Sequence, residues 1–295
     1  MISTTIQNQI FKETILDKSH DNLQVFQDLF NKILTKHYEE LYEAEADAST
    51  CLEDDVKAVI EIIGNGNESL NHLRYKWMTL IIILAVEPTL EYYDPNNRLP
   101  KIIIQVIEKS LYQNIKGSSN TINPDMLDKF INEIFRSHES YFHKKEANFQ
   151  AISEALNVFY NAIRVLDYHQ SVEAILEILD DCLEGDAIFP GYQGRRELFD
   201  WWLLDVVPAS YNLLPPTVFY VVEGVKNKEE IRSRQSRLLE KISKRIRSYL
   251  PELILESPKH KNYIFPSPGK INREAFKNSG KIRYQSKNPQ LAYSL

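Results

Sequence analysis

Glycine is scarce in this chain, with nine residues among 295, where an average composition would give about twenty. Glycine permits the tight turns of β folds and the close backbone approach of phosphate-binding loops. Its scarcity therefore argues against a turn-rich β fold and against a glycine-rich nucleotide loop. Neither a Walker loop nor a Gly-x-Gly-x-x-Gly pattern occurs in the sequence.

Cysteine and long apolar runs are also rare. Cys51 and Cys182 are the two cysteines, too few for a disulfide framework, and neither has a zinc-type spacing. Residues 1–22 are charged where a signal peptide would be apolar. The longest apolar stretch, residues 77–86, is about half of the ~20 residues that a membrane-spanning helix needs. We therefore expect a cytoplasmic protein without a transmembrane segment.

The charges are unevenly distributed along the chain. Residues 226–295 contain 17 Lys and Arg against 6 Asp and Glu, a balance of +11, so the balance of residues 1–225 is −17 within the net charge of −6. Such asymmetry indicates that the basic end binds an anionic partner or folds back on the acidic body.

Helical periodicity dominates the first part of the chain. Apolar residues recur at the i, i+3, i+4, i+7 spacing of amphipathic helices in segments near residues 23–42, 50–63, 68–87, 103–116, 127–135, 149–166 and 172–183. We predict an all-α fold: a multi-helix, antiparallel, bundle-like domain over residues 1–250, followed by an extended basic arm over residues 251–295.

Three local features are open to more than one interpretation. Residues 80–84 are apolar all round, which favours a central core helix that stops before Pro88, with a buried strand as the alternative. The composition changes after residue 185, so residues 186–216 are a candidate sub-boundary. There Pro208 is expected to interrupt the helical pattern, and residues 217–222 to form one short strand.

Two adjacent acidic residues, Asp180 and Asp181, lie at the end of a predicted helix, and Glu184 follows three residues after Asp181. Their pattern resembles the DDxxE motif with which class I terpene synthases hold magnesium and diphosphate, and the resemblance implies that Arg195 and Arg196 bind the diphosphate. The second metal motif of that family is absent downstream. A random chain with this many acids would contain about 1.6 such patterns. A solvated helix end is therefore the leading interpretation.

Two further patterns are interpreted as ordinary helix surface. Glu139, His143 and Glu146 share one helix face and could bind a metal, but Lys144 and Lys145 beside them favour surface ion pairs. The pair Arg164 and His169 resembles the Arg-x4-His motif of HEPN-type ribonucleases, a spacing that chance produces about once in such a chain. No catalytic residue and no metal ligand is predicted.

The aromatic segment 188–220 and the basic end carry the functional prediction. Trp201 and Trp202 are adjacent, so on a helix they cannot face the same core. The segment indicates either a second small core or an aromatic partner surface. A basic helix is predicted over residues 228–250.

We therefore predict a non-catalytic interaction or regulatory protein with an acidic or protein partner, or a homo-oligomer, and no cofactor. The first alternative is an enzyme that binds Mg²⁺ and diphosphate between Asp180 and Arg196. The second alternative is a nucleic-acid-binding helical protein, because aromatic residues are interleaved with the basic ones in the arm.

Overall fold

The computed structural model of the chain describes residues 30, 32–33, 35–37, 52–64, 68–115, 129, 132–133, 136, 149–183, 185–188, 195–222 and 225–249. The chain forms two compact units, Cys51–His260 and Met1–Thr50 with Lys261–Leu295. In the second of these, residues 30, 32–33 and 35–36 are helical. The predicted arm over residues 251–295 lies outside the described residues.

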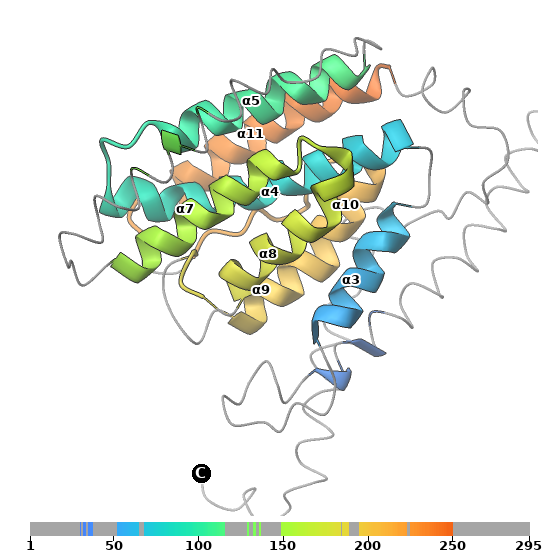
Figure 1. The fold of residues 1–295 in the computed structure, drawn as a ribbon, viewed down its shortest axis with the longest axis horizontal. Coiled ribbons are helices and arrows are strands. Elements are labelled where there is room, and N and C mark those ends of the chain that lie inside the picture. Colours follow the sequence, from blue (N-terminus) through green and yellow to red (C-terminus); the bar gives the residue numbers. More distant parts are fainter. Residues whose placement is uncertain are drawn as a thin grey trace, which may run out of the picture. The chain divides into compact units, whose positions relative to one another are not determined.

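The described part of the chain is all-α, as the periodicity predicts. The unit Cys51–His260 contains the following elements: α3 (Leu52–Ile63), α4 (Glu68–Tyr93), α5 (Leu99–Ile115), α7 (Phe149–Arg164), the 3₁₀ turn η1 (Tyr168–Gln170), α8 (Ser171–Leu183), α9 (Arg195–Trp201), the π-helical turn η2 (Trp202–Val206), α10 (Val207–Asn212) and α11 (Lys228–Arg247) (Figure 1).

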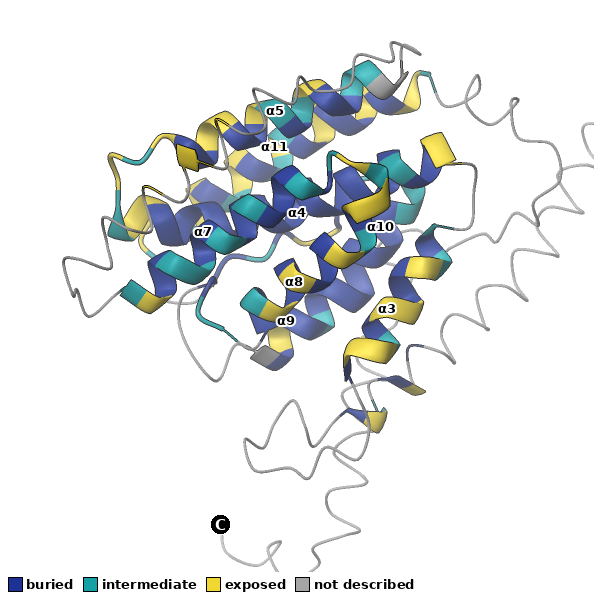
Figure 2. Ribbon diagram, in the orientation of Figure 1, coloured by how far each residue is buried: buried dark blue, intermediate teal, exposed yellow. Residues whose placement is uncertain are grey.

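Helix α4 is the centre of this unit. It contacts α5, α7, α8 and α10, and between Leu70 and Leu90 every residue except His72 is buried (Figure 2). The helical interpretation of the apolar run 80–84 is therefore confirmed, and the buried strand is excluded. No helix in the described ranges is both long and apolar enough to cross a membrane.

Two prolines do not end helices where the sequence suggests that they should. Pro88 lies inside α4, which continues to Tyr93. A proline in a helix interior costs about 3 kcal/mol, and the burial of the surrounding turns offsets this cost. Pro208 lies in the first turn of α10, where a missing N–H is tolerated. Helix α10 directly follows η2, and the N–H of its first residue, Val207, donates to the carbonyl of Trp202.

The strand expected at residues 217–222 does not form, and no strand occurs in the described part of the chain. This segment is irregular, and side chains use its carbonyl groups. Trp201 Nε1 donates to the Val218 carbonyl at 2.8 Å, and Arg232 Nε donates to the Phe219 carbonyl at 3.2 Å. The segment follows α10 in the chain and is bonded to α9 and α11 through these two side chains, without a partner strand.

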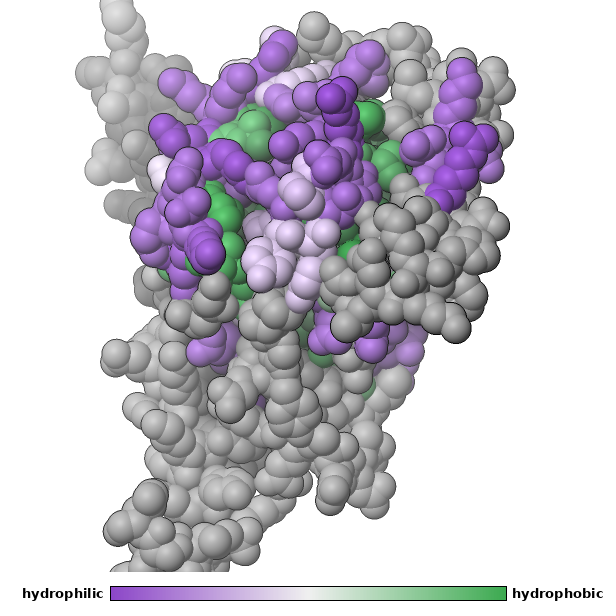
Figure 3. Space-filling model, turned by 90° about the vertical axis from the view of Figure 1, so that its left-hand side faces the viewer, coloured by the Kyte–Doolittle hydropathy of each residue, from purple (hydrophilic) through white to green (hydrophobic). Residues whose placement is uncertain are grey.

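The outside of the bundle is mainly polar. Figure 3 shows the side that lies at the left in Figure 1, where hydrophilic residues cover most of the described surface and small hydrophobic patches lie between them. The large hydrophobic side chains that are exposed in the described residues are Tyr92, Ile102 and Val218. None of them lies on α11 (Lys228–Arg247).

Candidate functional site

Helix α11 separates its residues into two faces. Its inner face is buried and consists of Ile231, Gln235, Leu239, Ile242, Ser243 and Ile246. This spacing of three and four residues places all six on one side of a helix. The helix also carries eight Lys and Arg against three Glu, and these charges lie largely outside the buried stripe. The inner face therefore binds α11 to the bundle, and the opposite face is cationic.

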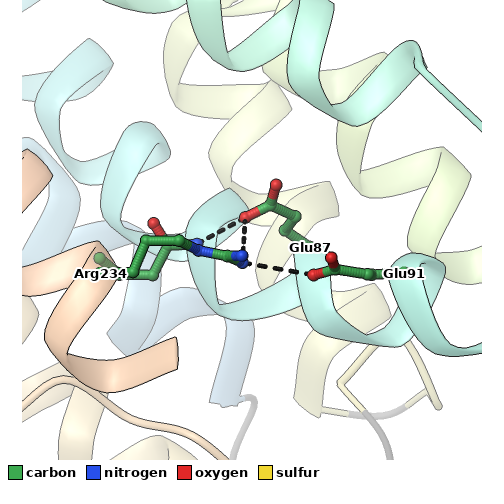
Figure 4. Close-up of polar contacts among 4 residues, drawn as sticks. Glu87, Glu91 and Arg234 are labelled. Carbon is green, nitrogen blue, oxygen red and sulfur yellow. Dashed lines mark hydrogen bonds and ion pairs between the residues drawn. The ribbon is translucent and has the colours of Figure 1, made fainter. Parts of the chain in front are cut away.

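A polar cluster attaches the first half of α11 to α4 (Figure 4). Arg234 Nη2 lies 3.5 Å from Glu87 Oε2 and 3.3 Å from Glu91 Oε2. The Gln235 amide donates to the same Glu87 oxygen. Burial raises the pKa of Glu87, although Arg234 and the Gln235 hydrogen bond oppose the shift. The rotation of α11 about its own axis is thus fixed by directional bonds as well as by apolar packing.

Further contacts hold the second half of α11 on the same side. Ser243 Oγ donates to the Leu213 carbonyl at 2.6 Å. The Arg245 guanidinium lies 4.2 Å from the centre of the Tyr112 ring on α5, which is a cation–π contact. Leu213 has a positive φ of 53° and ends α10, so Ser243 also stabilises an unusual turn. With α11 held in this way, Arg237, Lys241 and Lys244 lie on the side away from the bundle.

The outer row, which we define as Arg237, Lys241 and Lys244, is exposed along its length. The three residues follow an i, i+4, i+7 spacing, so they lie on one side of the helix. At 1.5 Å per residue they extend over about 10 Å. Glu240 is exposed beside them. Unlike Arg234 and Arg245, which contact α4 and α5, the outer row presents its charges to solvent.

At the acidic corner predicted from the sequence, carboxylates of α7 and α8 influence one another. Asp181 is half-buried, and its pKa rises to about 7, first because of burial and then because of Glu154, Asp180 and Glu177. The Glu154 carboxylate accepts the backbone N–H of Asp186. Within the described ranges, no three His, Cys, Asp or Glu side chains form a group that could hold a metal ion.

The remaining residues of that prediction are described only in part. Asp180 is exposed, and Arg196 is buried with its Nε 3.0 Å from Asp200 on the same helix. Glu184 and the side chain of Arg195 lie outside the described residues. Sequence reasoning missed Glu154, although the contact between α7 and α8 follows from the predicted antiparallel order of those helices.

Trp201 and Trp202 both lie in the core, at 4% and 1% exposure. Trp201 packs edge-on against Phe219, and Trp202 lies 5.8 Å from the ring of Phe199. The two indoles therefore face different layers, because adjacent residues of a helix point in different directions. Neither offers an exposed aromatic surface to a partner.

Buried basic residues on α4 are the features that sequence reasoning missed most completely. Lys76 is 2% exposed, and burial lowers its pKa to about 7. His72 Nε2 hydrogen bonds with the Val165 carbonyl at 2.9 Å, and burial, followed by the charge of Lys76, lowers the pKa of His72 to about 4. Their burial follows from the packing of α4 against α5, α7, α8 and α10, which the local sequence does not reveal.

The other predicted patterns add no site. Arg164 bonds to Asn161 at 2.9 Å and to Gln170 at 3.2 Å, and His169 is exposed. The trio of Glu139, His143 and Glu146 lies outside the described residues.

Comparison with known proteins gives no further guide. No protein-family model matches the chain, and no curated protein or solved structure matches it either. The function must therefore be argued from the chain's own surfaces, of which the outer row of α11 is the most sharply defined.

Proposed function

We propose that this chain is a non-catalytic binding protein of the cytoplasm that holds an anionic partner on the outer row of α11. One observation carries the proposal. The inner face and the flanking residues of α11 are bonded to the bundle, while Arg237, Lys241 and Lys244 are all exposed on one side. A rigidly mounted row of like charges suits a partner of the opposite sign.

The electrostatics of the whole chain support this assignment. Residues 1–225 carry a balance of −17, and the last seventy residues carry +11. A local cationic face on an otherwise acidic chain concentrates its field, and such a field steers an anionic partner during association. Exposed ion pairs contribute only about 0.2–1 kcal/mol each. Binding should therefore be modest and should weaken as salt is added.

The alternative enzyme between Asp180 and Arg196 has less support. Such an enzyme would need several carboxylates around its metal. It would also need an available guanidinium to bind the diphosphate. Arg196 is buried and bonded to Asp200 within α9. The proposal therefore rests on α11.

The proposal can be tested with a pair of charge-reversal variants. Fluorescein-labelled polyglutamate is titrated with the protein at 20 mM and 200 mM salt, and anisotropy reports binding. Lys241→Glu with Lys244→Glu should reduce affinity at least tenfold at low salt. The matched control reverses two exposed lysines elsewhere, Lys57 on α3 and Lys109 on α5, and should reduce affinity less than twofold.

The two double variants change the net charge by the same amount, so a general charge effect would weaken both equally. Equal losses, or an absence of binding by the unaltered protein at low salt, would overturn the proposed function. Exposed positions on a helix surface tolerate substitution, so every variant should keep the fold. Circular dichroism melting of each variant checks this.

A further inference from the structure

The form of the outer row narrows the partner to one class. We propose that the partner is an acidic protein segment that lies along α11 as a helix, an inference that rests on the proposed function. The spacing of the cations, the position of Glu240 and the lack of apolar and aromatic side chains in the outer row support this partner.

The spacing of the outer row is that of a helix surface. Arg237, Lys241 and Lys244 recur every three or four residues, which is about 5 Å per cation along the axis. Carboxylates at i, i+4 and i+7 of a second helix have the same spacing. Two helices that lie side by side can then pair these charges in register, as the flanking residues of paired helices do.

Glu240 distinguishes a protein partner from a continuous polyanion. It is exposed and lies directly before Lys241 in the sequence. A phosphate backbone that followed the row would bring negative charge close to this carboxylate, and like charges at close range repel. A helical partner has individual side chains, and a Lys or Arg opposite Glu240 would turn this repulsion into attraction.

A membrane surface does not fit the outer face. A helix that lies on a bilayer buries an apolar face in the lipid. Of the apolar residues of α11, Leu239, Ile242 and Ile246 are buried in the bundle at 0% exposure, and Leu238 is the one that is only half-buried. A single half-buried leucine does not make an apolar face. The outer row therefore has nothing to insert below the headgroups.

Single-stranded nucleic acid fits poorly for a related reason. Proteins that bind single strands stack the bases on aromatic side chains. Helix α11 contains no aromatic residue over Lys228–Arg247. The neighbouring ring that it contacts, Tyr112, is covered by the Arg245 guanidinium. The outer face thus offers charge without a stacking platform.

The test compares four labelled probes of similar charge with the full chain at 20 mM salt. The first is a helical peptide with Glu at i, i+4 and i+7. The second has the same composition, with the Glu residues placed on different sides of the helix. The third is a single-stranded DNA oligonucleotide, and the fourth consists of phosphatidylserine–phosphatidylcholine vesicles measured by co-sedimentation.

We expect the first peptide to bind at least fivefold more tightly than the second peptide and the DNA, with no sedimentation with vesicles. Its helix content, followed by circular dichroism, should rise on binding. Lys241→Glu with Lys244→Glu should abolish the preference, and the Lys57 and Lys109 control should retain it. A peptide with one Lys placed opposite Glu240 should bind more tightly than the all-acidic peptide, and Glu240→Gln should remove this gain.

The possible failures separate the two proposals. If DNA or vesicles bind more tightly than the first peptide and lose affinity on reversal of Lys241 and Lys244, the helical partner is wrong while the proposed function stands. If the two peptides bind equally well, the helical register is wrong. If no probe responds to the reversal, the proposed function fails as well.

Discussion

Helices α4 and α11 place similar charges in opposite surroundings. In α4, Arg74, Lys76 and Glu87 are buried at 7%, 2% and 7% exposure. In α11, the outer row is exposed, and Ile231, Leu239, Ile242 and Ile246 are buried on the opposite face. The difference teaches that a count of charged residues in a helix says little about function until the packing on each face is known.

The buried charges of α4 serve the fold. Arg74 Nη1 donates to the Ile63 carbonyl at the end of α3, and its Nε donates to the Tyr211 carbonyl near the end of α10, both at 3.0 Å. Its guanidinium also lies 3.8 Å from the centre of the Tyr211 ring. One side chain thus joins three helices. The outer row of α11 is exposed, and for this reason we propose the binding surface there.

The largest expected effect comes from removing the buried guanidinium. Arg74→Met keeps much of the apolar stem but leaves the Ile63 and Tyr211 carbonyls without this donor. Leaving buried polar groups unsatisfied costs about 1–3 kcal/mol each, so we expect a loss of about 4 kcal/mol of unfolding free energy in urea denaturation. Arg237→Met on the outer row is the matched control and should change stability by less than about 0.5 kcal/mol. Similar losses in both variants would remove the contrast between the two helices.

Because of Lys76, the free energy of unfolding should depend on pH in the range above 7. Its folded pKa of about 7 lies below the ordinary value of 10.5, so between these values the unfolded chain holds a proton that the folded chain lacks. The free energy of unfolding should therefore rise with pH from 7 to 10.5, with a slope of at most about 1.4 kcal/mol per pH unit. Lys76→Met should flatten this part of the profile.

The measurement is urea denaturation at half-unit steps from pH 6.5 to 9.5, taken as a difference between variant and parent. Taking this difference cancels the contributions of other groups that titrate in the same range, such as Asp181, whose pKa is also about 7. Lys241→Met on the outer row should leave the slope as it is. A slope that survives in Lys76→Met would show that Lys76 is charged in the folded protein throughout the range.

Much of the fold could be predicted from periodicity, because burying one face of a helix is a local property of the sequence. The apolar run 80–84 indicated a central helix, and the residues after 228 indicated a basic amphipathic one. Pro88 shows where local rules fail. A proline penalty of about 3 kcal/mol is outweighed by packing that involves residues distant in the sequence.

The candidate site was predictable in part. The sequence reveals that the end of the chain is basic, but it does not reveal which cations contact the bundle. Arg234 is engaged only because Glu87 and Glu91 of α4 lie beside it, a contact across more than 140 residues. Similarly, Asp181 acquires its raised pKa partly from Glu154 on another helix. Such pairs depend on the tertiary arrangement and carry no local signal.

The smallest expected effect lies where the two helices meet. Burial raises the folded pKa of Glu87 above its ordinary value of 4.5, so this group's contribution to stability falls as the pH rises above 4.5. Glu87→Gln keeps an oxygen that can accept from Gln235 and removes the buried charge, but it also removes the ion pair with Arg234. Because these terms oppose each other, the change in the free energy of unfolding at pH 7 should stay within about 1 kcal/mol.

The measurement is urea denaturation at pH 4.5 and at pH 7. The difference in unfolding free energy between the two pH values should be smaller in the variant than in the parent. Glu91→Gln, at the more exposed carboxylate, should leave that difference unchanged. A loss above about 2 kcal/mol of unfolding free energy in Glu87→Gln would mean that the charge pair itself holds α11 on α4. Arg234 of α11 would then be a structural charge like those of α4, and only the outer row of α11 would remain as the proposed binding surface.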